Sequence, residues 1–160
     1  MTPNDRITVA RGKGAYENIL SVLRRLRPDL PAKGRILIKP NCGRMAEPDS
    51  GINTSPAAVA AILDYLSEHT RAELLVGESP IRGVKTLPAL EKAGIADVAR
   101  ERDVTLADLD AEKPVRINLG ENRLLKTLKI CRLARAVDYI ISVPVMKTHM
   151  HTVVTLTFKN

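Results

Sequence analysis

The residues best suited to chemistry form a short segment rich in lysine and histidine. Lys147, His149 and His151 alternate along it, so on an extended segment they share one face. Histidine transfers protons near neutral pH or binds a metal ion, and lysine attracts anions. This pattern makes Lys147 and His149 candidate catalytic residues that bind and polarise an anionic or carbonyl substrate. A cluster of ordinary surface side chains is the alternative interpretation.

A second polar pair follows an apolar run of the sequence. Lys39 and Asn41 flank Pro40, directly after Ile36-Leu-Ile38. Lysine offers a point charge to a phosphate or carboxylate, and the asparagine amide is both a donor and an acceptor. The pair predicts a ligand-binding position, with an exposed strand end and a turn-forming asparagine as the alternative.

A third polar group follows the apolar run Ala72–Val76. Gly77 permits close approach of the backbone to a ligand, Glu78 suits an acid, a base or a metal ligand, and Ser79 comes next. An ordinary turn from strand to loop is the alternative. In open parallel sheets, ligands bind beyond the carboxyl ends of the strands, where successive loops meet. These three segments therefore predict one shared pocket, with Glu78 and Ser79 at its rim.

Other kinds of site are disfavoured by the residue pattern. Cys42 and Cys131 form no CxxC pair, and neither His69 nor any carboxylate spacing completes a ligand set, so no metal site is predicted in this chain. No Walker loop, GxGxxG, GxSxG or HExxH motif is present. Standard nucleotide-binding and hydrolase assignments are therefore unsupported.

The net charge of +7 favours acidic partners, of which a small anionic molecule is the expected one. Basic residues recur at every third position between 123 and 135, a spacing that makes no single stripe, and no aromatic residues lie among them to stack bases. Nucleic acid is therefore disfavoured as a partner. Arg24, Arg25 and Arg27 end an expected helix, where cations complement the helix dipole whatever the function.

The expected elements alternate between strands and helices. Strands are predicted at 7–10, 35–39, 72–76, 104–106 and 139–143, helices at 16–26, 56–66, 84–93 and 95–101, and a hairpin at 115–130. Thr54 or Ser55 is expected to cap the helix that begins at Pro56. The alternation predicts an α/β fold with a mostly parallel sheet and crossover helices on both faces, a Rossmann-like three-layer sandwich.

Residues 1–160 are long enough for one domain with its own core. Because the sequence stops within a strand-like run, we expect it to be a fragment of a longer, incomplete domain. No apolar run reaches the roughly 18 residues of a membrane span. The start also lacks the apolar region of a signal peptide. We therefore expect a cytoplasmic protein with no membrane partner.

Several segments together resemble the family catalogued as domain of unknown function 362. They are Ile36–Asn41, Asn53–Pro56, Val76–Pro80, and Asp138–His149 leading to Thr155–Asn160. The resemblance covers the amino-terminal half of the family pattern and adds Lys159 and Asn160 to the expected site. It departs at Val153, where the family often has glycine.

The resemblance also implies cofactors and partners. Many members carry a ferredoxin-like segment with two iron-sulfur clusters nearer the carboxyl end, so clusters are expected only in sequence beyond this chain. One hypothesis is a redox-associated small-molecule site in which Lys39, Lys147 and Lys159 bind an anion, Asn41 and Asn160 orient it, and His149 transfers a proton. The other is a non-catalytic scaffold that docks an iron-sulfur module. The sequence leaves open whether the protein is an enzyme.

Overall fold

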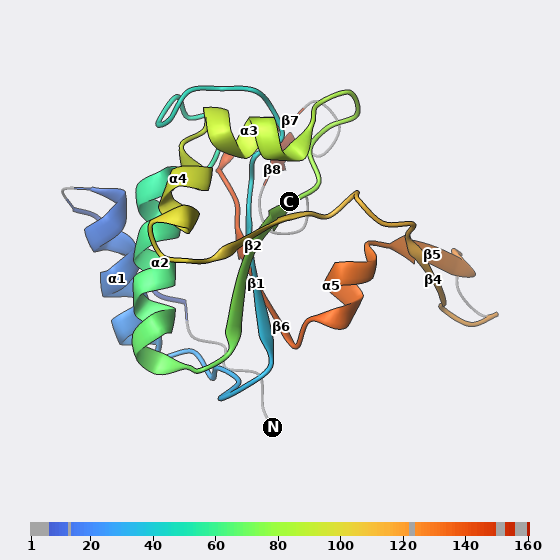
Figure 1. Ribbon diagram of the computed structural model, residues 1–160, viewed down its shortest axis with the longest axis horizontal. Coiled ribbons are helices and arrows are strands. Elements are labelled where there is room, and N and C mark those ends of the chain that lie inside the picture. The colour runs from blue at the N-terminus through green and yellow to red at the C-terminus, as the bar shows by residue number, and fades with distance from the viewer. Residues whose placement is uncertain (1–6, 13, 122–123, 150–152, 156–159) are drawn as a thin grey trace.

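The centre of the molecule is a four-stranded sheet in which every strand runs parallel to its neighbours (Figure 1). The computed structural model describes residues 7–12, 14–121, 124–149, 153–155 and 160. The strand order is β3-β2-β1-β6. The strands span Arg35–Pro40 (β1), Glu73–Glu78 (β2), Thr105–Asp108 (β3) and Tyr139–Val143 (β6).

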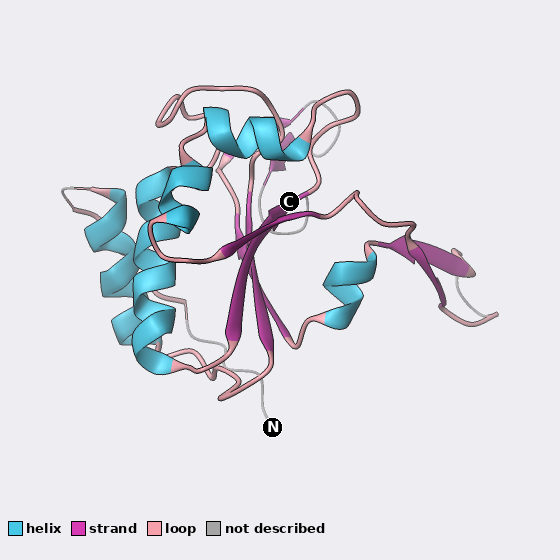
Figure 2. Ribbon diagram, viewed as in Figure 1, coloured by secondary structure: helices cyan, strands magenta, loops and turns pink. Residues whose placement is uncertain are grey.

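Helices cover both faces of this sheet, which confirms the predicted α/β class (Figure 2). One face carries α1 (Ala15–Leu26), α2 (Pro56–His69) and α4 (Ile95–Arg100), with α3 (Thr86–Lys92) near the carboxyl ends of the strands. The short helix α5 (Arg132–Ala136) lies against the other face.

The core follows from the apolar strands. Ile36, Leu37 and Ile38 of β1 are fully buried, as expected for a central parallel strand with helices on both sides. Ile36 and Ile38 pack in the larger cluster, with α2 and α4, because alternate side chains point to the same face. Leu37 points the other way and packs with Leu75 and the α5 side.

Two small antiparallel hairpins lie outside the main sheet. The first pairs β4 (Val115–Asn118) with β5 (Thr127–Ile130), as the turn residues predicted. The second pairs β7 (Lys147–His149) with β8 (Val153–Thr155). In β8, Val153 has a φ of 66°, a left-handed conformation that a β-branched side chain rarely adopts. Of the helices in the described ranges, not one has the length and apolarity needed to cross a membrane.

One local prediction is wrong, and another is confirmed only in part. Residues 7–10 form no strand, and their side chains are largely exposed, since no neighbouring strand pairs with them. Ser55 is the N-cap residue of α2, as predicted, but neither Thr54 nor Ser55 makes a side-chain hydrogen bond to the first turn of the helix. The predicted break between α3 and α4 is confirmed at Gly94, whose φ of 70° is readily adopted by glycine.

Candidate functional site

The carboxyl ends of β1 and β2 form one wall of a pocket of about 230 Å³. Because the two strands are parallel neighbours, Lys39 at the end of β1 and Glu78 at the end of β2 reach the same edge. The pocket is lined by Lys39, Asn41, Gly43, Glu78, Ser79, Pro80, Ile81 and Asn160. Five residues that the sequence singled out therefore lie around one cavity.

Glu78 is the most buried polar group of this edge, with 3% of its surface exposed. Its Oε1 accepts hydrogen bonds from Lys39 Nζ at 2.8 Å and from the Ser79 backbone N–H at 2.9 Å. Its Oε2 accepts a hydrogen bond from the Cys42 backbone N–H at 3.3 Å. Glu78 therefore lies deeper than the rim position expected from the sequence, and it fixes the Lys39 ammonium beside the pocket.

Asn41 is tied to the β7 hairpin by its side chain. Lys147 Nζ donates to Asn41 Oδ1 at 2.7 Å and to the Ile52 backbone oxygen at 2.6 Å. The Asn41 amide group uses its oxygen in this contact, and in the described part of the chain its Nδ2 has no hydrogen-bond partner. Lys147 itself does not line the pocket, so it acts here by holding Asn41 and the loop at Ile52.

The backbone of Asn41 is held by a buried threonine. Asn41 N–H donates to Thr54 Oγ1 at 2.8 Å, and Thr54 Oγ1 donates to the Val143 carbonyl at 2.6 Å. One hydroxyl thus joins the loop after β1, the start of α2 and the end of β6. This explains why Thr54 does not cap α2.

Asn160 closes the pocket from the side of β6. Its Nδ2 donates to the Lys39 carbonyl at 3.1 Å and to Ser142 Oγ at 3.0 Å, and Lys39 and Ser142 are register partners across β1 and β6. Its Oδ1 is buried and has no hydrogen-bond partner among the described residues. Buried amide oxygens are usually paired, so this atom is suited to accept a hydrogen bond from a bound donor.

Three other predicted residues lie partly or wholly outside the described part of the structure. The backbone of His149 lies in β7, paired with Val153, but its side chain falls outside the described part of the structure. Lys159 and His151 are outside the described residues. The ligand-binding and proton-transfer roles of all these residues stay predictions.

Sequence reasoning missed three contributors to this edge. Thr54 was expected only as a cap, and its partner Val143 lies 89 positions away, a separation that no local pattern reveals. Asp110 accepts from Ser79 Oγ at 2.9 Å through both carboxylate oxygens. Cys42 is fully buried beside Glu78, and burial raises the pKa of its thiol to about 12, with Glu78 adding to the rise and Lys147 opposing it.

Comparison with known proteins identifies the family. The family described as Domain of unknown function (DUF362) matches residues 36–160, which is most of the chain. This chain belongs to the DUF362 family. The matched range begins within β1 and includes every residue that lines the pocket. No curated protein and no solved structure gave a match.

The iron-sulfur clusters implied by the DUF362 resemblance do not fit the residues of this chain. A cluster takes about four cysteine thiolates, whereas the sequence has two cysteines, one buried in the core and one beside α5. Among the described residues, no group of three or more His, Cys, Asp or Glu side chains is arranged to hold a metal ion. Any cluster chemistry would have to come from another segment or partner.

Proposed function

We propose that the pocket at the carboxyl edge of this DUF362 protein binds a small anion through Lys39 and Asn41. The observation that carries the proposal is the Lys39–Glu78 pair at 2.8 Å, in which a buried carboxylate aims an ammonium group at a pocket. Glu78 uses one of the three ammonium hydrogens, so two are left for a ligand. The free Asn41 Nδ2 adds two more donors.

The donor set favours a carboxylate or phosphate group as the ligand. Lys39 and Asn41 offer hydrogens, and charge-assisted hydrogen bonds to anionic oxygens are stronger than those between neutral groups. The volume of about 230 Å³ limits the ligand to a small molecule, since pockets for drug-sized ligands usually span roughly 300–1,000 Å³. The buried Oδ1 of Asn160 would accept a hydrogen bond from a hydroxyl or a protonated oxygen of the same ligand.

The proposal has a catalytic form, in which His149 transfers a proton to or from the bound molecule. Lys147 contacts Asn41 directly and is assigned a positioning role in this form. Lys159 would add a second cation. Replacing His149 by Gln keeps a polar side chain of similar size, so it is expected to leave anion binding intact while abolishing turnover of a substrate.

Binding can be tested with inorganic phosphate and acetate as probes. Replacing Lys39 alone would leave the Glu78 charge buried, so the informative variant is the double substitution Lys39→Met with Glu78→Gln, which removes both charges. We expect saturating phosphate or acetate to raise the melting temperature of the wild type and not that of this variant.

A matched control is the exposed pair Lys126–Glu121, whose N···O distance is 2.9 Å. The substitution Lys126→Met with Glu121→Gln makes the same change of charge on the β4–β5 hairpin, and the anion response should be kept. An equal response in both double variants would show that the stabilisation comes from the general charge of the protein, and the pocket proposal would then be wrong.

A second candidate function, a scaffold that docks a redox-associated iron-sulfur module, is favoured by exposed apolar side chains. Leu124 is fully exposed, Leu125 is 62% exposed, and Ile140 on the edge strand β6 is 47% exposed. Neighbouring large apolar side chains that are exposed, such as Leu124 and Leu125, are typical of surfaces that contact another protein. Leu124→Ser with Leu125→Ser should abolish binding of a ferredoxin-like partner while leaving the phosphate response unchanged. Retained partner binding in this variant would exclude the hairpin as the docking surface.

A further inference from the structure

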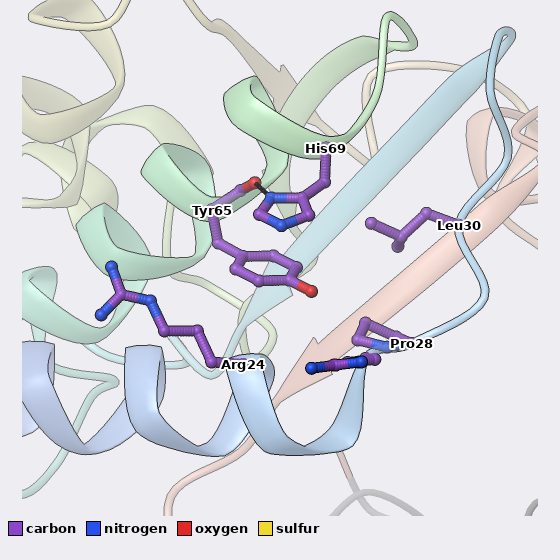
Figure 3. A pocket seen from close by; sticks show the side chains of 6 residues that line it. Arg24, Pro28, Leu30, Tyr65 and His69 are labelled. Atoms are coloured by element: carbon purple, nitrogen blue, oxygen red, sulfur yellow. Dashed lines mark hydrogen bonds between the residues drawn. The ribbon is translucent and has the colours of Figure 1, made fainter.

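A second, larger pocket lies at the opposite edge of the sheet, where the strands begin. It has a volume of about 610 Å³ and is formed by the last turns of α1 and α2 and the segment that leads into β1 (Figure 3). Its lining consists of two arginines, a tyrosine, a histidine and two apolar residues: Arg24, Arg27, Pro28, Leu30, Tyr65 and His69. The carboxyl-edge site contributes none of these residues.

The two rings of this pocket are placed by helix geometry. Tyr65 and His69 are four residues apart on α2, so they lie on the same face of the helix. Their rings stack with centroids 3.9 Å apart and planes 14° apart. His69 Nδ1 faces the Tyr65 carbonyl oxygen at 2.7 Å, which requires Nδ1 to carry the proton. The histidine ring is therefore fixed, and its Nε2 is turned away from the helix backbone.

Basic residues at the ends of helices have an ordinary explanation in the helix dipole, but that explanation does not cover Tyr65. Tyr65 is only 4% exposed as a whole residue, and its hydroxyl makes no hydrogen bond within the described part of the chain. The hydroxyl oxygen is not among the buried polar atoms that lack a partner there, so it is accessible from the pocket and can donate to a ligand. Figure 3 shows this hydroxyl pointing away from α2, toward the side of the pocket formed by Pro28 and Leu30.

The two arginines are also without protein partners. Over the described ranges, the side chains of Arg24 and Arg27 make no ion pair and no hydrogen bond. By contrast, Arg102 contacts Asp64 through two nitrogens, at 2.7 and 3.1 Å. Guanidinium groups bind phosphate through paired hydrogen bonds, and two of them beside one cavity are suited to a phosphate group.

We propose that this pocket binds a small aromatic phosphate monoester. Its phosphate group pairs with the guanidinium of Arg27 and accepts a hydrogen bond from the Tyr65 hydroxyl, while Arg24 adds positive charge from the other side of the Tyr65 ring (Figure 3). Its ring packs against Pro28 and Leu30, which give the pocket an apolar wall opposite Arg24 (Figure 3). The volume of about 610 Å³ accommodates a molecule of this size, since ligand pockets usually span roughly 300–1,000 Å³.

Phenyl phosphate is the probe, and isothermal titration of the whole chain is the measurement. We expect saturable binding of phenyl phosphate that is at least about tenfold tighter than that of inorganic phosphate or phenol, because only the ester uses both the cations and the apolar wall. Equal affinity for phenyl phosphate and inorganic phosphate would overturn the assignment of the ring, and the absence of saturable binding would overturn the site.

Substitutions separate this pocket from general charge effects. Arg24→Ala with Arg27→Ala should weaken phenyl phosphate binding by at least about tenfold. Tyr65→Phe removes only the hydroxyl and should weaken binding about threefold to tenfold. The control is Arg25→Ala, which removes a neighbouring arginine of α1 that does not line the pocket, and it should change the affinity less than about twofold.

The two pockets can also be tested independently of each other. The double variant Lys39→Met with Glu78→Gln should bind phenyl phosphate like the wild type, because those residues lie at the other edge of the sheet. Loss of phenyl phosphate binding in that variant, or in Arg25→Ala to the same degree as in the double arginine variant, would contradict the proposal.

Discussion

Basic side chains lie both at the carboxyl edge of the sheet, where the strands end, and at the amino edge, where they begin, but their surroundings differ. At the carboxyl edge, Lys39 and Lys147 are both engaged, one by Glu78 and the other by Asn41 and a backbone carbonyl. At the amino edge, the side chains of Arg24 and Arg27 make no such contacts within the described residues. The carboxyl edge is therefore part of the folded framework, whereas the amino-edge cations contribute little to it.

This difference has a physical origin in burial. Glu78 is 3% exposed, and a buried charge is tolerated only when it is paired and hydrogen-bonded. Exposed arginines remain solvated, so they need no protein partner. Substitutions at the carboxyl edge should consequently alter both stability and binding, and substitutions at the amino edge should alter binding alone.

The largest expected contrast concerns the reactivity of Cys42, which lies behind the carboxyl-edge pocket. With a pKa of about 12, about one thiol in ten thousand is ionised at pH 8, and only the thiolate reacts with alkylating agents. In a Cys131→Ser variant, alkylation by iodoacetamide should be more than about a thousandfold slower in the native state than in urea. Rapid labelling of native Cys42 would show that the carboxyl edge is open rather than closely packed.

The second-largest effect is expected on the free energy of unfolding when Glu78 is replaced. Glu78→Ala removes the acceptor of Lys39 Nζ and of two backbone N–H groups, so we expect a loss of about 3 kcal/mol in the free energy of unfolding, measured in urea. The double variant Lys39→Met with Glu78→Gln should recover part of this loss. If Glu78→Ala changed the free energy of unfolding by less than about 0.5 kcal/mol, the carboxyl edge would contribute no more to stability than the amino edge.

Thr54→Val tests the hydroxyl that links the loop after β1 to β6. The variant keeps the shape of the side chain but leaves the Val143 carbonyl and the Asn41 N–H without this partner, so we expect a loss of about 1.5 kcal/mol. Ser67→Ala is the control, since Ser67 Oγ makes an exposed hydrogen bond within α2 and its loss should change stability by less than about 0.5 kcal/mol. Equal effects in the two variants would contradict the linking role of Thr54.

Val153→Gly should raise the free energy of unfolding slightly, and it tests whether the backbone of the β7–β8 hairpin is strained at position 153. The φ of 66° at Val153 is unfavourable for a β-branched residue, and its side chain is 78% exposed, so little burial is lost on substitution. After the entropic cost of glycine, we expect a net gain of about 1 kcal/mol. Val154→Gly, at a position without a left-handed backbone, should lower stability, and the same sign in both variants would argue against strain at 153.

The smallest effect is expected at the amino edge. Arg24→Ala should change the free energy of unfolding by less than about 0.5 kcal/mol, because its guanidinium is exposed and has no ion pair among the described residues. A loss of more than about 1 kcal/mol in urea unfolding would mean that this edge, like the other, holds the fold together.

Much of the fold could be predicted because local patterns encode it. The apolar runs at Ile36–Ile38 and Tyr139–Val143 identified two strands of the main sheet, and Gly94 identified the break between two helices. The strand predicted at residues 7–10 was wrong, since a short apolar alternation forms a strand only where a neighbouring strand can pair with it. The family resemblance, confirmed over residues 36–160, strengthened the fold prediction for the same stretch.

The sequence by itself determined which polar residues follow the strands, because parallel strands bring their carboxyl ends to one edge, and Lys39, Asn41, Glu78 and Ser79 accordingly line one pocket. Only the tertiary structure decided which of these groups pair. Burial and contacts between distant segments made Glu78 a buried partner of Lys39. They also brought Arg24 of α1 and Tyr65 of α2 to the same pocket, although no pattern within either helix indicates the other.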